Sequence, residues 1–402
     1  MLQAWKPDFL TKLYVFSLCL MVYAAADVSW LFFIPRPPLY VLAGLLSITK
    51  MLNTGAHSTK KKIIWIVIWL VFNIIIVVFA MSPLALLFRL LFVLIMSSVI
   101  LLSLDEMKYL LKILTNCFVL ILLISIPAWI LYLIGVPLAH TGPHYHEDGF
   151  HVYYDFYFFT TSSSEGSTYS RFSSVFLEPG QMATPCAFLF HLNSRENKLF
   201  QFKNVIMIVA IIMSFSLIAY GLLLFSLVVN RMSRSRFKVP ATIITLLLIG
   251  GLGLYFTSHE DNAVYALIVS RLEYDEETTI AGYNRTNEYF DSRYEDLMHS
   301  KDKYFGIHGQ SLDWTTNTSG YKKFIVHNGI VGFAIVMALM LVLWLDNRKR
   351  STLMFVIMVI VAFLVRDMLT TPLWMTCAII GMYILGADSK KEAYPNQIIT
   401  ER

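Results

Sequence analysis

Residues 169–192 read YSRFSSVFLEPGQMATPCAFLFHL and combine a charged stretch with an apolar run, the two features from which the fold can be predicted. An apolar run begins directly after an arginine (Arg171), a glutamate (Glu178) and a Pro-Gly pair. Apolar runs of about twenty residues, each long enough to cross a ~30 Å hydrocarbon core, recur from end to end of the chain. The 402 residues are 57% hydrophobic and 15% charged, against about 25% charged in soluble domains. We therefore predict an all-α, polytopic membrane protein.

The apolar runs predict about twelve transmembrane helices, with about eleven to thirteen as the range. One stretch, 199–230, has two interpretations, because it could form one long helix or a tight hairpin of two short ones. The predicted spans are 10–26, 38–53, 63–81, 83–104, 110–134, 178–193, 199–216, 217–230, 239–257, 324–345, 352–369 and 372–387.

Clusters of Lys and Arg decide between these interpretations. A hairpin that turns near Ser214 to Ser216 puts every cluster on one face, whereas a single crossing puts three clusters opposite the other two. The positive-inside rule therefore favours the hairpin and a multi-pass orientation with both termini cytoplasmic. The clusters are residues 57–62, 194–203, 231–238, 346–350 and 389–391.

This topology divides the chain into five segments and leaves two long loops on the external face. Binding or chemistry is expected in these loops and at the helix ends beneath them. The segments are N-terminal transmembrane helices (1–134), a first external loop (135–177), central transmembrane helices with a short hairpin (178–257), a large external loop (258–323), and C-terminal transmembrane helices with a cytoplasmic tail (324–402).

Each external loop contains a predicted element. Residues 150–161 are rich in β-formers and aromatics and predict a strand or hairpin at the membrane surface. Residues 286–300 predict an amphipathic helix lying on the membrane, with Thr286 as its N-cap. The apolar face of this helix would carry Phe290, Tyr294, Leu297 and Met298.

Several arginines fall on the predicted external face: Arg36, Arg89, Arg171, Arg285, Arg293 and Arg366. An arginine inside a membrane segment costs ~2.5–3.5 kcal/mol on insertion scales and usually faces a cavity or a partner. Guanidinium groups bind phosphate oxygens with two parallel hydrogen bonds, so a lipid-linked diphosphate at the membrane surface is one ligand. Other interpretations stay open, namely internal ion pairs (Arg171 with Glu178, Arg366 with Asp367) and snorkelling of Arg36 and Arg366 to the interface.

Glu178 has two interpretations as well. Pro179 suits the first position of a helix, which makes Glu178 the N-cap beside the positive end of the helix dipole. The residue is then either a structural cap or a positioned carboxylate that acts as a general base or orients a sugar hydroxyl. The sequence HYHED at 144–148 does not complete a ligand set at structural-site spacing. We predict no metal, no cofactor and no nucleic-acid partner.

Five stretches, in order, resemble the Wzy-type polymerases of O-antigen and capsular polysaccharide. Arg171 to Ala183 resembles the family's RF-x-x-x-F-x-EP-x-x-x-A stretch, and Ser214 to Gly221 resembles the serine-containing helix hairpin that follows it. Asn284-Arg285 and Lys303 to Gly309 are similar to the arginine and FG-x-G segment of the large external loop. Residues 319–332, ending in G-x-x-G, resemble the exit from that loop. The resemblance covers about half of the chain, roughly 170–333.

The resemblance implies a GT-C-like fold and a metal-independent glycosyltransferase in the bacterial cytoplasmic membrane. Such an enzyme joins oligosaccharide repeats carried on undecaprenyl diphosphate and releases undecaprenyl diphosphate. The resemblance assigns diphosphate binding to Arg171 and Arg285, with Arg89 and Arg293 as second-rank candidates. It assigns assistance of the acceptor hydroxyl to Glu178 or His308, and acceptor or sugar contacts to His327 and Tyr220. A flippase and a chain-length regulator are the implied protein partners, beside membrane lipid.

Three alternatives remain. O-antigen ligases of the same superfamily carry a His-Asn or Ser-His-Asn pair before the final G-x-x-G, and here residues 316–319 read TNTS with no histidine. A flippase or transporter usually shows internal repeats and midplane binding, and this sequence shows no such repeat. A scaffold for assembly enzymes is the third alternative.

Overall fold

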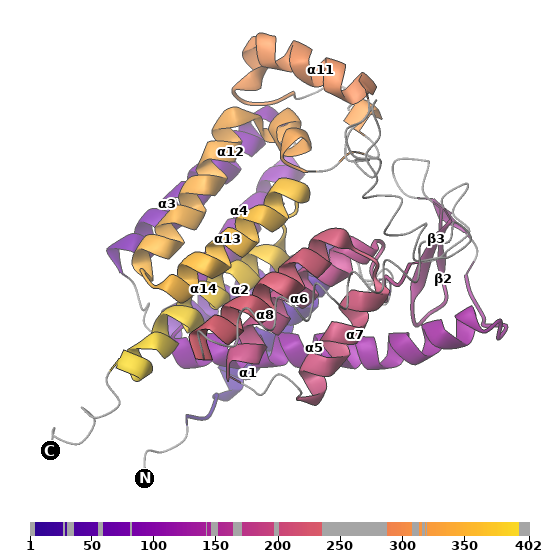
Figure 1. Cartoon of the computed structure of the whole chain (residues 1–402). Coiled ribbons are helices and arrows are strands. Elements are labelled where there is room, and N and C mark those ends of the chain that lie inside the picture. The colour runs from indigo at the N-terminus through magenta and orange to yellow at the C-terminus, as the bar shows by residue number, and fades with distance from the viewer. Residues whose placement is uncertain are drawn as a thin grey trace, which may run out of the picture. The chain divides into compact units, whose positions relative to one another are not determined.

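A computed structural model shows that the chain is mostly helical (Figure 1). The residues that it describes contain twelve α-helices, two short 3-10 turns and three short strands. These residues are 5–26, 29, 36–54, 59–80, 83–141, 143–145, 152–163, 171–196, 201–234, 288–307, 313–315, 318 and 320–393.

The helices agree with the predicted spans. Eleven of the twelve predicted spans coincide with a helix, and the twelfth, 239–257, lies outside the described residues. The helices are α1 (Phe9–Ala24), α2 (Arg36–Thr54), α3 (Lys60–Ala80), α4 (Pro83–Ile100), α5 (Leu104–Leu133), α6 (Pro179–Glu196), α7 (Phe202–Met213), α8 (Leu217–Arg234), α11 (Glu288–His299), α12 (Tyr321–Asp346), α13 (Arg350–Val365) and α14 (Pro372–Ala393).

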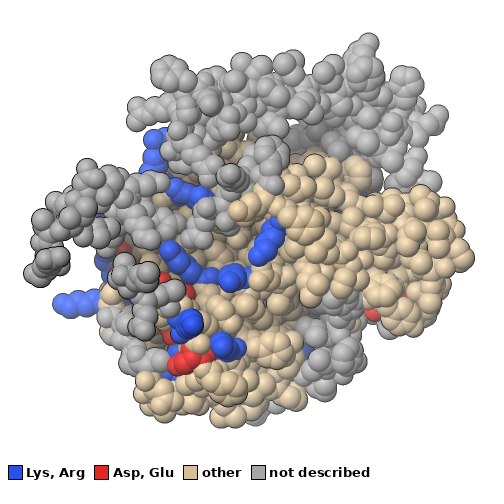
Figure 2. Space-filling view, turned by 90° about the horizontal axis from the view of Figure 1, so that it is seen from below, with Lys and Arg blue, Asp and Glu red and all other residues tan. Residues whose placement is uncertain are grey.

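Helix length and composition bear on the membrane assignment. In the described part of the chain, α5 and α12 are long and apolar enough to cross a bilayer, and six further apolar helices or helix segments are shorter. Large apolar side chains lie exposed on α1 to α5, α7, α8, α12 and α13. Among the described residues on the face shown in Figure 2, most are uncharged, and Lys and Arg are more visible than Asp and Glu. These features favour membrane association, and the number of crossings stays a prediction.

The predicted hairpin within 199–230 is confirmed. Helix α7 ends at Met213 and α8 begins at Leu217, so the chain turns at Ser214 to Ser216 as the charge distribution indicates. Phe215 at the centre of the turn has a left-handed φ of 46°, which is uncommon for a bulky residue.

The chain forms two compact units. The first contains residues 1–117, 294–311 and 320–402, and the second contains 118–293 and 312–319. Helix α14 is largely buried in the first unit and α6 in the second. Among the described residues, neither of these two helices exposes a large apolar side chain. The motif at 171–183 therefore leads into the most deeply buried helix of its unit.

Aromatic residues on α3 organise the packing of the first unit. Trp65, Trp69 and Phe72 follow one another at helical spacing, with ring centroids 5.8 Å and 5.5 Å apart, and all three are buried. Phe72 in turn lies parallel to Phe324 of α12, at 6.4 Å. This row joins α3 to α12, and the two helices run side by side in Figure 1.

The segment 135–177, which was predicted to be the first external loop, contains a small antiparallel sheet in the order β1-β2-β3. The strands are β1 (His144–Tyr145), β2 (Val152–Asp155) and β3 (Thr160–Ser163), with Asp155 opposite Thr160 at the turn. The prediction of a strand or hairpin over 150–161 is confirmed, and the all-α class holds apart from this sheet.

Helix α11 has the predicted amphipathic character, and part of its apolar face is buried. Phe290 and Leu297 are buried, and the Phe290 ring lies 5.4 Å from that of Trp314. The chain's own residues therefore cover Phe290 and Leu297, whereas Tyr294 and Met298 are partly exposed, and the placement of this helix on a membrane stays a prediction. Thr286, its predicted N-cap, lies outside the described residues.

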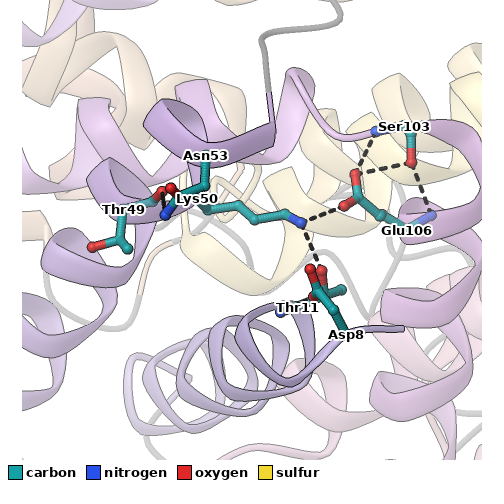
Figure 3. Close-up of polar contacts among 7 residues, drawn as sticks. All are labelled: Asp8, Thr11, Thr49, Lys50, Asn53, Ser103 and Glu106. Carbon is teal, nitrogen blue, oxygen red and sulfur yellow. Dashed lines mark hydrogen bonds and ion pairs between the residues drawn. The ribbon is translucent and has the colours of Figure 1, made fainter. Parts of the chain in front are cut away.

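A buried ion pair joins three helices of the first unit (Figure 3). Lys50 of α2 lies with its Nζ 2.5 Å from Glu106 Oε1 of α5, and it also donates to Thr11 Oγ1 of α1 at 2.6 Å. Glu106 accepts hydrogen bonds from the backbone N–H and the hydroxyl of Ser103, both at 2.9 Å, and so caps α5. Asp8 caps α1 by accepting the Thr11 N–H at 2.7 Å. One lysine thus connects the capped starts of two helices.

This ion pair predicts a non-additive effect of substitution. Lys50 and Glu106 side chains are 3% and 10% exposed, and removal of one partner from a buried pair costs about 3–5 kcal/mol because it leaves a buried charge. Lys50→Met and Glu106→Gln are each expected to lower the free energy of unfolding by that order. The double variant should recover most of the loss, as measured by thermal unfolding in detergent.

Lys61→Met is the matched control. Lys61 lies 4.0 Å from Asp346 and is 46% exposed, so its loss should cost less than about 1 kcal/mol. Additive losses in the Lys50 and Glu106 double variant would show that the pair is not coupled.

Candidate functional site

Residues 171–178 form a strap across the second unit, and its first residue holds the α7–α8 turn. Arg171 donates from Nε to the Ser214 carbonyl at 3.1 Å and from Nη2 to the Phe215 carbonyl at 2.8 Å. The Phe172 N–H donates to the Met213 carbonyl at 3.2 Å. The last carbonyls of a helix have no partner within the helix and carry its negative partial charge. The guanidinium therefore acts as a positive cap on the end of α7.

Two serines fix the middle of the strap. Ser173 Oγ donates to the Thr160 carbonyl at 2.8 Å, and the Thr160 N–H donates to the Ser174 carbonyl at 2.7 Å, which ties the strap to the start of β3. Ser174 Oγ donates to Ser125 Oγ of α5 at 2.8 Å. All four side chains are buried. The strap therefore connects the sheet, α5 and the α7–α8 turn.

Aromatic side chains on the strap pack against α5. Phe172 meets Trp129 edge-on at 5.5 Å, and Phe176 lies 5.6 Å from Phe118. Both phenylalanines are fully buried, so the spacing of this motif reflects packing as well as any role in binding.

Glu178 takes the predicted N-cap position of α6. The helix begins at Pro179, and the Glu178 carbonyl accepts the Gln181 and Met182 N–H groups at 3.1 Å and 3.3 Å. The residue is partly exposed. Its carboxylate thus stands at the positive end of the most buried helix of the unit, where the dipole stabilises a negative charge.

Tyr220 and Arg171 come together on the same turn. The Tyr220 hydroxyl of α8 donates to the Ile212 carbonyl of α7 at 2.5 Å, beside the carbonyls that Arg171 holds. Arg293 lies on the exposed face of α11, where Nη2 is 3.3 Å from the Tyr289 hydroxyl and the guanidinium lies 5.5 Å from the Tyr289 ring centre.

The other predicted site residues belong to the first unit or lie outside the described residues. Arg89 is partly buried on α4 and lies near Tyr40 of α2. His327 is partly buried on α12. Arg285 and His308 fall outside the described residues.

A crossing of two backbones, which sequence reasoning did not predict, lies beside His327. Helix α12 is broken at Gly329, with φ 68° and ψ 176°, and the segment 304–307 runs through the break. The Ile307 N–H donates to the Val326 carbonyl at 2.8 Å, and the Val331 N–H donates to the Tyr304 carbonyl at 3.1 Å. The backbone groups that the break would leave without helical partners are therefore hydrogen-bonded to the segment 304–307, which contains the start of the FG-x-G motif. The glycines of the two motifs were the signal that could have indicated such a contact.

An ionisable cluster lies where α12 begins and α13 ends in the first unit. Asp367 follows the last turn of α13 and accepts a hydrogen bond from the Gly320 N–H at the start of α12. Lys323 and Arg366 lie close enough to interact electrostatically with this carboxyl. Charged clusters of this kind occur at functional sites and also in structural ion-pair networks.

The described residues contain no group of three or more His, Cys, Asp or Glu side chains that could hold a metal ion. No protein-family model, curated protein or solved structure matches the chain. The residues of the second unit that could take part in chemistry are Arg171 and Tyr220 at the α7–α8 turn, and Glu178 at the N-terminus of α6.

The backbone crossing predicts a severe effect of a single methyl group. A Cβ on Gly329 would lie 2.2 Å from the Tyr304 carbonyl oxygen, and its backbone conformation is one that only glycine adopts readily. Gly329→Ala is expected to lower the free energy of unfolding by about 3 kcal/mol or more, as measured by thermal unfolding in detergent. Gly221→Ala on α8 is the control, because nothing lies within 4 Å of its Cβ position. Equal melting temperatures of the two variants would contradict the crossing.

Proposed function

We propose that the chain is a Wzy-like polysaccharide polymerase of the bacterial cytoplasmic membrane. It joins oligosaccharide repeats carried on undecaprenyl diphosphate at the external face and releases undecaprenyl diphosphate. The observation that carries the proposal is the position of Arg171, whose guanidinium is held by two backbone carbonyls at the α7–α8 turn. The motif resemblance around this residue supports the same activity.

The hydrogen bonds of Arg171 suit it to bind a diphosphate. A guanidinium is a planar group with five N–H donors, and Nε and Nη2 of Arg171 donate to the Ser214 and Phe215 carbonyls. These bonds fix the orientation of the planar group, while the guanidinium stays charged at any working pH. A positive charge held in place before the reaction stabilises the charge that develops on a leaving diphosphate, at no cost of reorganisation.

The topology of the proposal follows from the hairpin. Helices α7 and α8, of 12 and 18 residues, are joined at Ser214 to Ser216, and we propose that the pair returns the chain to the side of the membrane from which it entered. With about twelve crossings and both termini cytoplasmic, the turn and the strap at 171–178 face the periplasm. The flipped lipid-linked repeat is on this side of the membrane.

The remaining residues take supporting roles. Arg285 is the second ligand of the diphosphate, and Arg89 and Arg293 are second-rank candidates. Glu178 assists the acceptor hydroxyl from the N-terminus of α6, with His308 as the alternative base. Tyr220 and His327 contact the acceptor or its sugars. No metal is required, because a diphosphate is already a good leaving group and positioning supplies much of the catalysis.

Arginine substitutions test this proposal in purified enzyme with a lipid-linked repeat as substrate. Arg171→Ala and Arg285→Ala are each expected to lower the rate of chain growth by about 10²-fold, the usual effect of removing one preorganised charge-stabilising donor. Arg171→Lys keeps the charge but loses the planar fork, so it should also be impaired. Thermal unfolding of each variant separates this loss from loosening of the α7–α8 turn.

Arg348→Ala is the matched control, because Arg348 is an exposed cation between α12 and α13, on the cytoplasmic face in the proposed topology. Its activity should equal that of the wild type. If the Arg171 and Arg285 variants stay near wild-type activity while folded, diphosphate binding by these residues is wrong.

The glycan profile of a deletion strain distinguishes the alternatives. Loss of a polymerase leaves a single repeat on the acceptor, which is the expected result. Long glycan left on the undecaprenyl carrier would indicate a ligase, and lipid-linked repeat trapped on the inner leaflet would indicate a flippase. Either of the last two results would overturn the proposed reaction.

A further inference from the structure

The β2–β3 hairpin ends in two aromatic residues that its turn displays to the outside. Tyr157 and Phe158 are 52% and 49% exposed, and Tyr157 has a left-handed φ of 65°, which is rare for a bulky residue. Asp155 Oδ1 accepts the Tyr157 N–H at 2.8 Å, and the Phe158 N–H donates to the Phe156 carbonyl at 2.8 Å. The turn is therefore held in a conformation that presents both rings.

The base of this tip is attached to the end of α5. Phe156 and Phe159 stack on each other with centroids 4.8 Å apart and planes 4° apart. Both also pack on Tyr132 in the last turn of α5, at 5.0 Å and 5.5 Å. Of the four aromatic residues at 156–159, Phe156 and Phe159 therefore fix the hairpin to α5, and Tyr157 and Phe158 project from it.

Exposed apolar residues line the carboxyl half of α5 and the residues just after it. The helix has 30 residues, or about 45 Å at ~1.5 Å per residue, which exceeds a ~30 Å hydrocarbon core. Its carboxyl end therefore reaches the interface if the helix crosses the bilayer. The exposed residues are Leu120 (58%), Ile124 (38%), Ile130 (46%), Leu131 (43%) and Leu133 (52%) on α5, followed by Ile134 (69%) and Val136 (38%) after the helix.

We propose that Tyr157 and Phe158, together with Leu133 and Ile134 at the end of α5, insert into the lipid headgroup region and anchor the external sheet to the bilayer. This inference rests on the membrane topology of the proposed function. Aromatic residues are enriched at this depth because their rings suit a boundary between apolar and polar surroundings. Residues 130–141 and 152–163 contain no Lys or Arg, so apolar burial drives the insertion and anionic lipid is not required.

The anchor bears directly on the strap. Thr160, at the start of β3, exchanges hydrogen bonds with Ser173 and Ser174. Insertion of the tip therefore sets the depth of the strap, and with it Arg171, relative to the phosphates of the lipid. The anchor is a positioning device for the diphosphate site.

Site-directed spin labelling tests the anchor. The full chain carrying Phe158→Cys is labelled with a nitroxide and reconstituted in phosphatidylcholine vesicles, and its accessibility to oxygen and to a water-soluble nickel chelate is measured. Ser292→Cys, on the exposed face of α11, is the aqueous reference, and Leu120→Cys on α5 is the lipid reference. Wild-type protein, whose four cysteines are buried or half-buried, gives the labelling background.

We expect the label at 158 to be shielded from nickel at least fivefold relative to 292 and accessible to oxygen, with no change when one third of the lipid is phosphatidylglycerol. Nickel access equal to that at 292 overturns the anchor. So does spin–spin broadening between copies, or shielding that appears only after a lipid-linked oligosaccharide is added. If the label at 120 is also exposed to nickel, α5 does not cross the bilayer and the membrane topology itself fails.

Discussion

The α7–α8 turn of the second unit is held by hydrogen bonds between the Arg171 guanidinium and the Ser214 and Phe215 carbonyls, which directly follow α7. A helix end leaves carbonyls without partners, and in an apolar surrounding each unpaired group costs several kcal/mol. A tight hairpin of two short helices produces this problem at its turn. Two residues from a separate segment of the chain provide the partners. Arg171 donates to the Ser214 and Phe215 carbonyls, and the Phe172 N–H donates to the Met213 carbonyl. The strap then carries this constraint to β3 and α5.

The first unit meets the same physical problem at Gly329, with a different solution. The break in α12 would leave N–H and carbonyl groups unpaired, and the segment 304–307 pairs with them. Only glycine allows the two backbones to approach this closely. Irregular backbone at membrane depth is tolerated where protein buries it or where it lines a polar cavity. Both units thus place their motif residues beside interrupted helices, where backbone and side chain are fixed together.

The sequence predicts the helices and the hairpin well, because run length and charge distribution are local or additive signals. The turn at Ser214 to Ser216 and the helix start at Pro179 both lie where they were expected. Contacts between distant segments could not be predicted. Nothing in the local pattern pairs Lys50 with Glu106, and amphipathicity alone does not say whether lipid or Trp314 covers Phe290. The motif glycines indicated close approach without identifying the partner.

Lys50 and Arg171 are held by different kinds of partner, a carboxylate in one case and backbone carbonyls in the other. Lys50 is buried against a carboxylate, so the charges of the two groups largely cancel and the pair has a structural role. The bonds from Arg171 to Ser214 and Phe215 hold the guanidinium through backbone dipoles, which fix the orientation of its plane. A carbonyl carries only a partial charge, so these two bonds orient the cation without the neutralisation that a carboxylate brings. Under the proposed function, the interaction that stabilises the α7–α8 turn also fixes the position of the group that binds the diphosphate.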